Sequence, residues 1–366
     1  MANAPTIGIL GGGQLGRMLA LAGYPLGLRF RFFEPAEHAP AGQLAEHARG
    51  AYDDLAALDR FAENLVLVSY EFENVPLAAA RHLAERVPVF PPPQALAAAQ
   101  DRLAEKRFFQ QLGAATPPFA PVDTRADLDA ALARIGLPAV LKTRRFGYDG
   151  KGQALLRDRA GVDAAWAELS GQPLILEGFV AFERELSLLA ARGRDGSVAC
   201  YPLVENLHCG GILRRSLAPA PGLTRALQAA AEQLAESALA ALDYVGLLAI
   251  ELFEAGGQLL VNEMAPRVHN SGHWTIEGAE TSQFEQHLRA ALGLPLGATA
   301  VRGHAAMLNL IGELPDSTAV LAIPGAHLHL YGKAPRPGRK VGHITLRADD
   351  PATLVDLLAQ AELLLA

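Results

Sequence analysis

Four short apolar runs alternate with Ala- and Leu-rich stretches at the start of the chain. The runs cover residues 7–10, 30–33, 65–68 and 87–90. Short apolar segments separated by stretches of helical composition are typical of strand and helix units around a parallel sheet, whose strands are buried on both faces. The pattern therefore predicts a Rossmann-like domain over residues 1–93.

The pattern changes further along the chain. A Phe-Pro-Pro-Pro-Gln stretch at residues 90–94 precedes one long helical stretch that ends near Gly113. Short strands, more helices and a strand–turn–strand pattern follow, and short strands rich in Gly and Pro then lead to a final amphipathic helix. We predict an α/β and α+β chain, with a central α+β domain over residues 94–300 and a small, mostly β C-terminal domain over residues 301–366.

Composition narrows the class of protein. The chain has 366 residues, of which 50% are hydrophobic, and a formal net charge of −7, which suits a globular protein without a nucleic-acid partner. Its two cysteines, Cys200 and Cys209, match neither a disulfide framework nor a metal-binding spacing. No leader pattern and no apolar run long enough to cross a bilayer is found, so we expect a cytoplasmic protein without a membrane partner.

Lysine is rare in this chain. Five of the 32 Lys and Arg residues are lysines: Lys106, Lys142, Lys151, Lys333 and Lys340. An ammonium group that binds a phosphate cannot be replaced by a planar guanidinium without moving the charge. The five lysines are therefore candidate site residues, although their survival by chance is the alternative.

A glycine-rich turn follows the first apolar run. Gly11, Gly13 and Gly16 have the G-x-G-x-x-G spacing of a dinucleotide-binding loop, and Glu34 stands where a ribose-binding acid would lie. Taken alone, this turn predicts a nicotinamide enzyme. The remaining motifs favour a different ligand.

Two apolar strands flank an Ala-Gly-Gly-Gln turn at residues 255–258, and each carries one acid. A hairpin centred on the two glycines would place Glu251 directly opposite Glu263. Facing carboxylates repel each other unless a cation neutralises them, and Mg²⁺ is commonly held by one or two carboxylates together with substrate phosphates. The hairpin thus predicts a site for a magnesium nucleotide. The alternative is a one-residue slip that puts the acids on opposite faces.

A polar loop directly follows this hairpin. It contains Arg267, His269, Asn270, Ser271 and His273, and polar loops at strand ends often carry binding residues. Zinc is disfavoured because no cysteine lies nearby. Ordinary loop polarity is the alternative that stays open.

A second glycine-rich loop, here called the flap (residues 144–152), follows a short apolar strand that ends with Lys142. It combines glycines with basic residues: Arg144, Arg145, Gly147, Gly150, Lys151 and Gly152. Glycines let backbone N–H groups approach an anion, and positive charge strengthens the attraction. We predict a cover over phosphates, with an ordinary hairpin turn as the alternative. Glu177 and Glu185 in the following strands are weaker candidates for contacts to adenine and ribose.

In their order along the chain, these features resemble the ATP-grasp enzymes, and within them the N5-carboxyaminoimidazole ribonucleotide synthetase family of purine biosynthesis. The motifs are GILGGGQLGRM, YEFENVP, DRLAEKRFF, GYDGKGQ, NEMAPRVHNSGHW, SQFEQHLRA and YGKAPRPGRKVGHI. The resemblance implies a ligase that converts 5-aminoimidazole ribonucleotide, bicarbonate and ATP to N5-carboxyaminoimidazole ribonucleotide, ADP and phosphate through carboxyphosphate. It also implies ATP and Mg²⁺ as cofactors, and a homodimer.

The same resemblance assigns roles to residues. For the nucleotide it implies Arg102, Lys142, Gly147, Tyr148, Asp149, Gly150, Lys151, Gly152, Gln153, Glu177, Gly178, Phe179, Val180, Glu185, His208, Asn262 and Glu263. For magnesium it implies Glu251 and Glu263. For the ribonucleotide and bicarbonate we expect Gln14, Glu71, Glu73, Tyr148, Asp149, Lys151, His269, Asn270, Lys333, Arg339 and Lys340.

The catalytic candidates are Arg267, His273 and Lys151, with Arg267 expected to steady the carboxyphosphate. The amine of the substrate must lose a proton, and three bases remain open: His273, an acid of the motif YEFENV, and the released phosphate. The competing functions are a nicotinamide dehydrogenase, a nucleotide sensor without turnover, and a sister ligase with another acceptor.

Two positions depart from the family pattern. Phe146 replaces the first glycine of the usual Gly-Gly-Tyr-Asp sequence in the flap, and Ala265 stands where the wider superfamily often has an asparagine. We therefore expect a stiffer flap or altered phosphate contacts, and a metal ion held by two glutamates and water.

Overall fold

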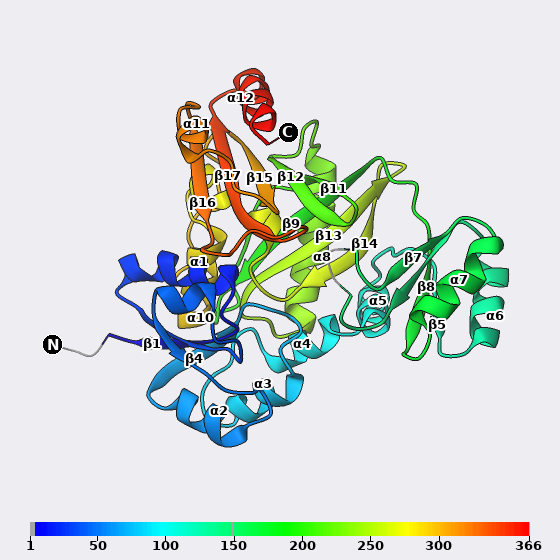
Figure 1. Cartoon of the computed structure of the whole chain (residues 1–366), viewed down its shortest axis with the longest axis horizontal. Coiled ribbons are helices and arrows are strands. Elements are labelled where there is room, and N and C mark those ends of the chain that lie inside the picture. The colour runs from blue at the N-terminus through cyan, green and yellow to red at the C-terminus, as the bar shows by residue number, and fades with distance from the viewer. Residues whose placement is uncertain (1–3, 148–149, 366) are drawn as a thin grey trace.

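The structure, a computed structural model, describes residues 4–147 and 150–365 (Figure 1). Within these residues the strands form three sheets, one in the N-terminal part, one small sheet to the right in Figure 1, and one large sheet in the centre. Short 3₁₀ turns lie at Tyr24–Leu26, Pro40–Gln43 and Asn270–Gly272. No helix in the described part of the chain is both long and apolar enough to cross a membrane.

The N-terminal sheet is parallel, in the order β3-β2-β1-β4, which confirms the predicted Rossmann-like arrangement. Its elements are β1 (Thr6–Leu10), α1 (Gln14–Gly23), β2 (Arg29–Phe33), β3 (Glu46–Ala48), α2 (Leu55–Ala62), β4 (Leu65–Tyr70) and α3 (Leu77–Ala84). The strand predicted at residues 87–90 is reduced to one bridge between Val68 and Val89, because Pro88 and Pro91 lack the N–H groups that a strand ladder needs.

The single helix predicted after the prolines is in fact two helices, α4 (Pro93–Ala99) and α5 (Arg102–Gln111). The break lies at Asp101, whose carboxylate accepts hydrogen bonds from the N–H groups of Leu103 and Ala104 and so caps α5. As a result, Arg102 occupies the first position of α5 and faces the site described below.

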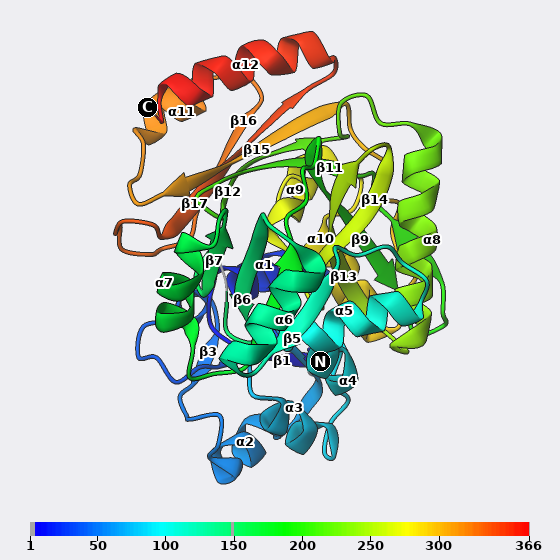
Figure 2. The same ribbon diagram turned by 90° about the vertical axis from the view of Figure 1, so that its right-hand side faces the viewer.

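The small sheet is antiparallel, in the order β5-β8-β6-β7. Its elements are β5 (Phe119–Val122), α6 (Arg125–Ile135), β6 (Ala139–Thr143), β7 (Gln153–Leu156), α7 (Ala160–Leu169) and β8 (Leu174–Gly178). Helices α6 and α7 pack against it through an apolar core of their own. The flap connects β6 to β7. In Figure 2 the small sheet and its helices lie in front of the large sheet.

The large sheet has the order β14-β13-β9-β11-β12-β15-β17-β16, with β10 paired to β9. Its strands are β9 (Arg184–Arg192), β10 (Val198–Cys200), β11 (Val204–Cys209), β12 (Ile212–Ala218), β13 (Gly246–Ala255), β14 (Gln258–Ala265), β15 (His304–Ile311), β16 (Ala326–Leu330) and β17 (Lys340–Ala348). The helices around it are α8 (Arg225–Ala241), α9 (Thr275–Gly278), α10 (Gln283–Leu292), α11 (Ser317–Leu321) and α12 (Pro351–Leu363).

The C-terminal strands continue this large sheet and do not form a sheet of their own. Strand β15 pairs with β12, for example Ser216 with Met307. This pairing covers an edge of β12 that would otherwise present unpaired backbone groups. It also carries residues near the C-terminus to the same region as the central hairpin.

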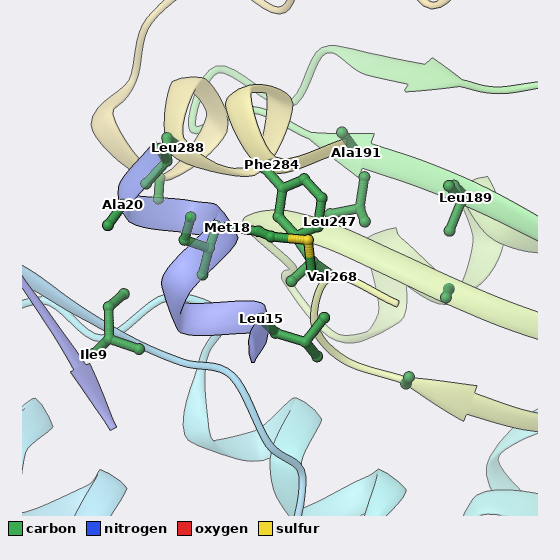
Figure 3. Close-up of a cluster of buried hydrophobic side chains, with 14 of the residues drawn as sticks. Ile9, Leu15, Met18, Ala20, Leu189, Ala191, Leu247, Val268, Phe284 and Leu288 are labelled. Carbon is green, nitrogen blue, oxygen red and sulfur yellow. The ribbon is translucent and has the colours of Figure 1, made fainter. Parts of the chain in front are cut away.

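An apolar cluster fixes the N-terminal sheet on the large sheet. Figure 3 shows Leu15 and Met18 of α1 beside Phe284 of α10 and Leu247 of β13. Each of these side chains is buried, and burial of a large apolar side chain contributes about 1.5–3 kcal/mol. Because α1 begins at Gln14, the cluster also sets the position of the glycine-rich turn relative to β13 and β14.

Candidate active site

A cleft of about 1060 Å³ lies between the three sheets. Nearly all of the predicted site residues line it, from Gln14 in the N-terminal part to Lys340 in the C-terminal part. Two predicted residues, Gly152 and His273, are not among its lining residues. Tyr148 and Asp149 lie outside the described residues. The fold thus gathers side chains that are far apart in the sequence around one cavity.

The hairpin of β13 and β14 turns at Gly256 and Gly257, whose φ angles of 59° and 71° suit a tight turn. Glu251 pairs with Glu263, as the sequence predicts. The register shifts between Glu251 and Leu252, where a bulge leaves Asn262 without a cross-strand partner. The two carboxylates therefore belong to one directly opposed pair.

The two glutamates have opposite electrostatic surroundings. Burial and the neighbouring charge of Glu263 raise the pKa of Glu251 to about 7. Burial also disfavours the charged form of Glu263, but the guanidinium of Arg102 outweighs it and lowers the pKa of Glu263 to about 2. Arg102 Nη1 lies 2.6 Å from Glu263 Oε2, and His269 Nε2 lies 3.3 Å from Glu251 Oε1. Two neighbouring carboxyl groups repel each other when both are ionised, so their pKa values move apart.

The donor atoms in this pair of strands fit a hard divalent cation. Glu251 and Glu263 provide carboxylate oxygens, and Asn262 Oδ1 is buried without a hydrogen-bond partner. Among the described residues, no cluster of three or more His, Cys, Asp or Glu side chains is arranged to hold a metal ion by itself. A magnesium ion here would take its remaining ligands from phosphate and water, as is usual for Mg²⁺.

Cationic side chains and a buried glutamate line the cleft beside the small sheet. Lys142 at the end of β6 places its Nζ 2.9 Å from Glu177 Oε2. Despite its burial, Glu177 has a pKa lowered to about 2 by Lys142 and Lys106. The Glu177 side chain is thus already paired with two lysines. Glu185 and His208 face each other across β9 and β11 at 2.8 Å.

The flap is only partly as predicted. Gly147, Gly150, Lys151 and Gln153 line the cleft. The side chain of Arg144, by contrast, makes two hydrogen bonds to Asp101, of 3.0 and 2.7 Å, so its charge is engaged by the cap of α5. Gly152 packs against Thr143, where a Cβ would lie 2.7 Å from Oγ1.

Phe146 has a left-handed backbone with a φ of 62°, and its ring is 69% exposed. A glycine would adopt that conformation without strain, whereas a phenylalanine costs roughly 1–2 kcal/mol. The departure from the family pattern thus falls at a position where the backbone favours glycine.

The glycine-rich turn at the start of α1 already holds an anion, the carboxylate of Glu71. The N–H group of Gly13 donates to Glu71 Oε1, and that of Gly16 donates to Oε2 at 2.6 Å. A Cβ at Gly11 or Gly13 would lie within 2.6 Å of Glu71 side-chain atoms. Because a protein carboxylate fills the helix N-terminus, a pyrophosphate has no room there. Glu34 also acts locally, accepting a hydrogen bond from Gly12 N at 3.2 Å.

Some residues of the polar loop after β14 line the cleft, whereas others are buried in the core. Arg267 Nε donates to Glu73 Oε2, and Asn270 exchanges two amide hydrogen bonds with Asn309 of β15, of 3.0 and 2.7 Å. His273 is instead 1% exposed and packs against Phe284. The structure thus places His273, which follows the 3₁₀ turn Asn270–Gly272, in the core and not at the wall of the cleft. Its role as a catalytic base stays a prediction that this geometry does not support.

Basic residues from the C-terminal part close the other end of the cleft. Lys333, Arg339 and Lys340 all line it, and Lys333 Nζ donates to Gln14 Oε1. Burial, together with neighbouring Arg339 and Lys340, lowers the pKa of Lys333 to about 8, although Glu71 opposes the shift. These residues form a cationic end wall suited to a phosphate.

Several residues that support the site escaped the sequence analysis. Asp101 was hidden inside a stretch that reads as one helix. Asn309 is a lone amide in an apolar strand, a pattern that signals a buried partner. Glu105, whose carboxylate accepts a hydrogen bond from Met264 N of β14, gives no signal in the sequence, because charged residues on a helix are usually solvated.

Sequence models of three domain families match the chain in succession. They are a ribonucleotide synthetase preATP-grasp domain at residues 4–100, an ATP-grasp domain at residues 107–284, and a phosphoribosylaminoimidazole carboxylase C-terminal domain at residues 305–356. The N5-carboxyaminoimidazole ribonucleotide synthase of Pseudomonas aeruginosa is 56% identical over 359 residues, which cover 98% of this chain and 99% of that protein. This chain belongs to the N5-carboxyaminoimidazole ribonucleotide synthase family.

Solved structures of the family agree with the fold. The N5-carboxyaminoimidazole ribonucleotide synthetase of Thermus thermophilus is 64% identical, with a TM-score of 0.95 and 98% of both chains covered. The N5-carboxyaminoimidazole synthase of Aspergillus clavatus, solved in complex with ADP and 5-aminoimidazole ribonucleotide, is 32% identical, with a TM-score of 0.91, and the match covers 99% of this chain and 100% of that one. Family membership confirms the resemblance drawn from the motifs and the predicted fold class.

Proposed function

We propose that this protein is an ATP-dependent ligase of purine biosynthesis that carboxylates 5-aminoimidazole ribonucleotide with bicarbonate. The products are N5-carboxyaminoimidazole ribonucleotide, ADP and phosphate. One observation beyond family membership carries the proposal. A single cleft joins an opposed acidic pair and a glycine-rich flap at one end to a cationic wall at the other. A triphosphate with its metal and a phosphorylated acceptor could thus bind face to face.

The nucleotide would bind between the small sheet and the hairpin. Arg102, Lys142 and the flap residues Gly147 to Gln153 would surround its phosphates. The backbone at Gly178, Phe179 and Val180 would contact the adenine, and Glu185 and His208 the ribose side. Glu251 and Glu263 would hold Mg²⁺ with Asn262 beside them, and the ion would neutralise the charge that develops on the transferred phosphoryl group.

The chemistry needs two steps that must be kept from bulk water. An oxygen of bicarbonate attacks the γ-phosphorus of ATP, forming carboxyphosphate and releasing ADP. The exocyclic amine of the acceptor then takes the carboxyl group, and phosphate leaves. Arg267, a permanent cation deep in the cleft, would stabilise the carboxyphosphate, with Lys151 of the flap covering it and His269 and Asn270 beside it.

The released phosphate is our choice for the base that accepts the amine proton. His273 faces the core, and Glu71 is engaged by the turn it caps. Glu73 is paired with Arg267, which lowers its pKa below the usual value in spite of its burial and makes it a weak base. A base works best when its pKa lies near the working pH, and phosphate meets that condition.

The acceptor would bind with its phosphate at the cationic wall of Lys333, Arg339 and Lys340. Gln14 and Glu73 also line the cleft and would contact the ribose or imidazole. Following the resemblance, we also propose a homodimer, which light scattering would test. A cytoplasmic location stays a prediction that cell fractionation would check.

The decisive experiment measures ADP release with each candidate acceptor, with and without bicarbonate. We expect ADP only when 5-aminoimidazole ribonucleotide, bicarbonate and Mg²⁺ are present together. Release with formate and another amine would support a sister ligase. ATP binding without ADP release under all conditions would support a nucleotide sensor and refute the proposal.

A further inference from the structure

The opposed acids depend on a local irregularity in β14. Near the turn, Ala255 pairs with Gln258 and Leu252 with Val261. If that register continued, Glu251 would face Asn262 and not Glu263. Glu263 would then lie on the opposite face of the hairpin, because neighbouring residues of a strand alternate between faces. The bulge at Asn262 is therefore what brings the two carboxylates together.

Two adjacent side chains of α5 bind the backbone on both sides of Glu263. Lys106 Nζ donates to the carbonyl oxygen of Asn262 at 2.5 Å and to that of Val261 at 3.2 Å. On the other side, Glu105 Oε1 accepts a hydrogen bond from the N–H group of Met264 at 2.6 Å. Strand β14 is the edge strand of the large sheet, so backbone groups on its outer side have no neighbouring strand to pair with. Helix α5 provides partners for three backbone groups at the bulge.

We propose that Glu105 and Lys106 are positioning residues, which hold the bulge of β14 and so keep Glu251 and Glu263 on one face for a shared divalent cation. The proposal rests on the function proposed above, because it takes the two glutamates as metal ligands. Neither Glu105 nor Lys106 touches the reacting groups in this scheme. Both act through the backbone of β14.

A simpler explanation is that Lys106 only forms a structural salt bridge with Glu177. The contacts of Lys106 argue against this explanation. Lys106 is 1% exposed, and burying a lysine is costly unless the charge is paired and hydrogen-bonded. Its nearest anion, Glu177 Oε2, lies 3.5 Å away and is already bound by Lys142 at 2.9 Å. Both carbonyl contacts of Lys106 are shorter. The ammonium group therefore lies closer to the carbonyl oxygens of the bulge than to the carboxylate of Glu177.

The test compares five variants with the wild type. Lys106→Met removes the ammonium group and keeps the length of the side chain. Glu105→Gln keeps an acceptor oxygen for Met264 N, whereas Glu105→Met removes it. Arg107→Met is the matched control, since it makes the same kind of change at an exposed position of the same helix. Glu263→Gln changes a proposed metal ligand itself and shows how large the loss of Mn²⁺ affinity is in that case.

Two measurements separate positioning from general stability. The first is the affinity for Mn²⁺ in the presence of ADP, followed by electron paramagnetic resonance. The second is hydrogen exchange of the backbone segment 258–266. For Lys106→Met and Glu105→Met we expect at least tenfold weaker Mn²⁺ binding and at least tenfold faster exchange in this segment. In Glu105→Gln and Arg107→Met, the Mn²⁺ affinity and the exchange rate should both stay within twofold of the wild type. The KM for the ribonucleotide should stay within twofold of the wild type in all four variants of α5.

The outcomes distinguish the two proposals. Wild-type Mn²⁺ affinity in folded Lys106→Met and in Glu105→Met would overturn the positioning role and leave the proposed function intact. Failure of the wild type itself to bind Mn²⁺ with ADP would overturn the metal assignment and the positioning role with it. If Lys106→Met does not fold, the Glu105→Met and Glu105→Gln pair decides alone. Equal Mn²⁺ affinity in those two would refute the proposal.

Discussion

Replacing Glu71 tests the most unexpected contact in the N-terminal part, the carboxylate inside the glycine-rich turn. The side chain is 7% exposed and accepts hydrogen bonds from Gly13 N and Gly16 N. Leucine has a similar volume but no acceptor. The Glu71→Leu variant would therefore leave two N–H groups at the start of α1 without partners and would open little new cavity.

The expected magnitude follows from those two groups. A buried donor left unsatisfied costs about 1–3 kcal/mol, so the free energy of unfolding should fall by roughly 2–6 kcal/mol in Glu71→Leu. Glu71→Gln retains one acceptor oxygen but turns an amide N–H₂ group toward the second donor. We expect it to lose about half as much. Glu37→Leu is a suitable control, because Glu37 is an exposed residue of the same sheet domain.

Urea denaturation at constant temperature measures these differences. If Glu71→Leu lowered the free energy of unfolding by less than about 1 kcal/mol, the carboxylate would not be the partner of the turn, and the reasoning would be refuted. A second readout uses the vacated anion site. Inorganic phosphate should stabilise Glu71→Ala more than the wild type, because the free N–H groups at a helix N-terminus bind anions.

Three further predictions concern the cleft. Glu263→Gln should keep its fold and lose Mg²⁺-dependent ADP release by about a thousandfold; retained turnover would remove Glu263 from the metal site. Lys340→Ala should raise the KM for the ribonucleotide about tenfold with little change in kcat, since a contact to the phosphate of the substrate mainly serves binding; steady-state kinetics would show an unchanged KM if this is wrong. Because the pKa of Lys333 is lowered to about 8, its charge is present below that pH and lost above it. A pH profile should show kcat/KM for the ribonucleotide falling above about pH 8, and Lys333→Arg should abolish that fall because arginine stays charged.

The hairpin shows which part of the site the sequence could predict. The turn glycines and the apolar strands are adjacent in the chain, so the local pattern predicts the hairpin and, to within one residue of register, the pairing of Glu251 with Glu263. The bulge does not follow from it. Its partners come from α5, about 155 positions earlier in the chain, and no local feature of β14 reveals them. The rarity of lysine makes Lys106 a candidate site residue, but it does not indicate that its side chain is buried.

The buried position of His273 could not be predicted from the sequence for a similar reason. A histidine in a polar loop is usually exposed to solvent, and the sequence offers no sign that a short 3₁₀ turn precedes it. In the structure the ring of His273 lies 4.9 Å from that of His343 and 5.6 Å from that of Phe284. Both partners come from elements that follow it in the chain. Loop direction thus depends on contacts that sequence spacing does not encode.

The glycine-rich turn shows why a motif can predict a physical need without predicting its ligand. Glycines at positions 11 and 13 are required because an anion approaches the N-terminus of α1 more closely than a Cβ would allow. In a dinucleotide-binding domain that anion is a pyrophosphate. Here it is a carboxylate attached to the end of β4, the neighbouring strand. A carboxylate held by the protein cannot leave, so this turn is filled before any substrate arrives and serves to fix α1. The residue that decides between the two uses is therefore the one that follows the adjacent strand, and an acid at that position argues against a dinucleotide.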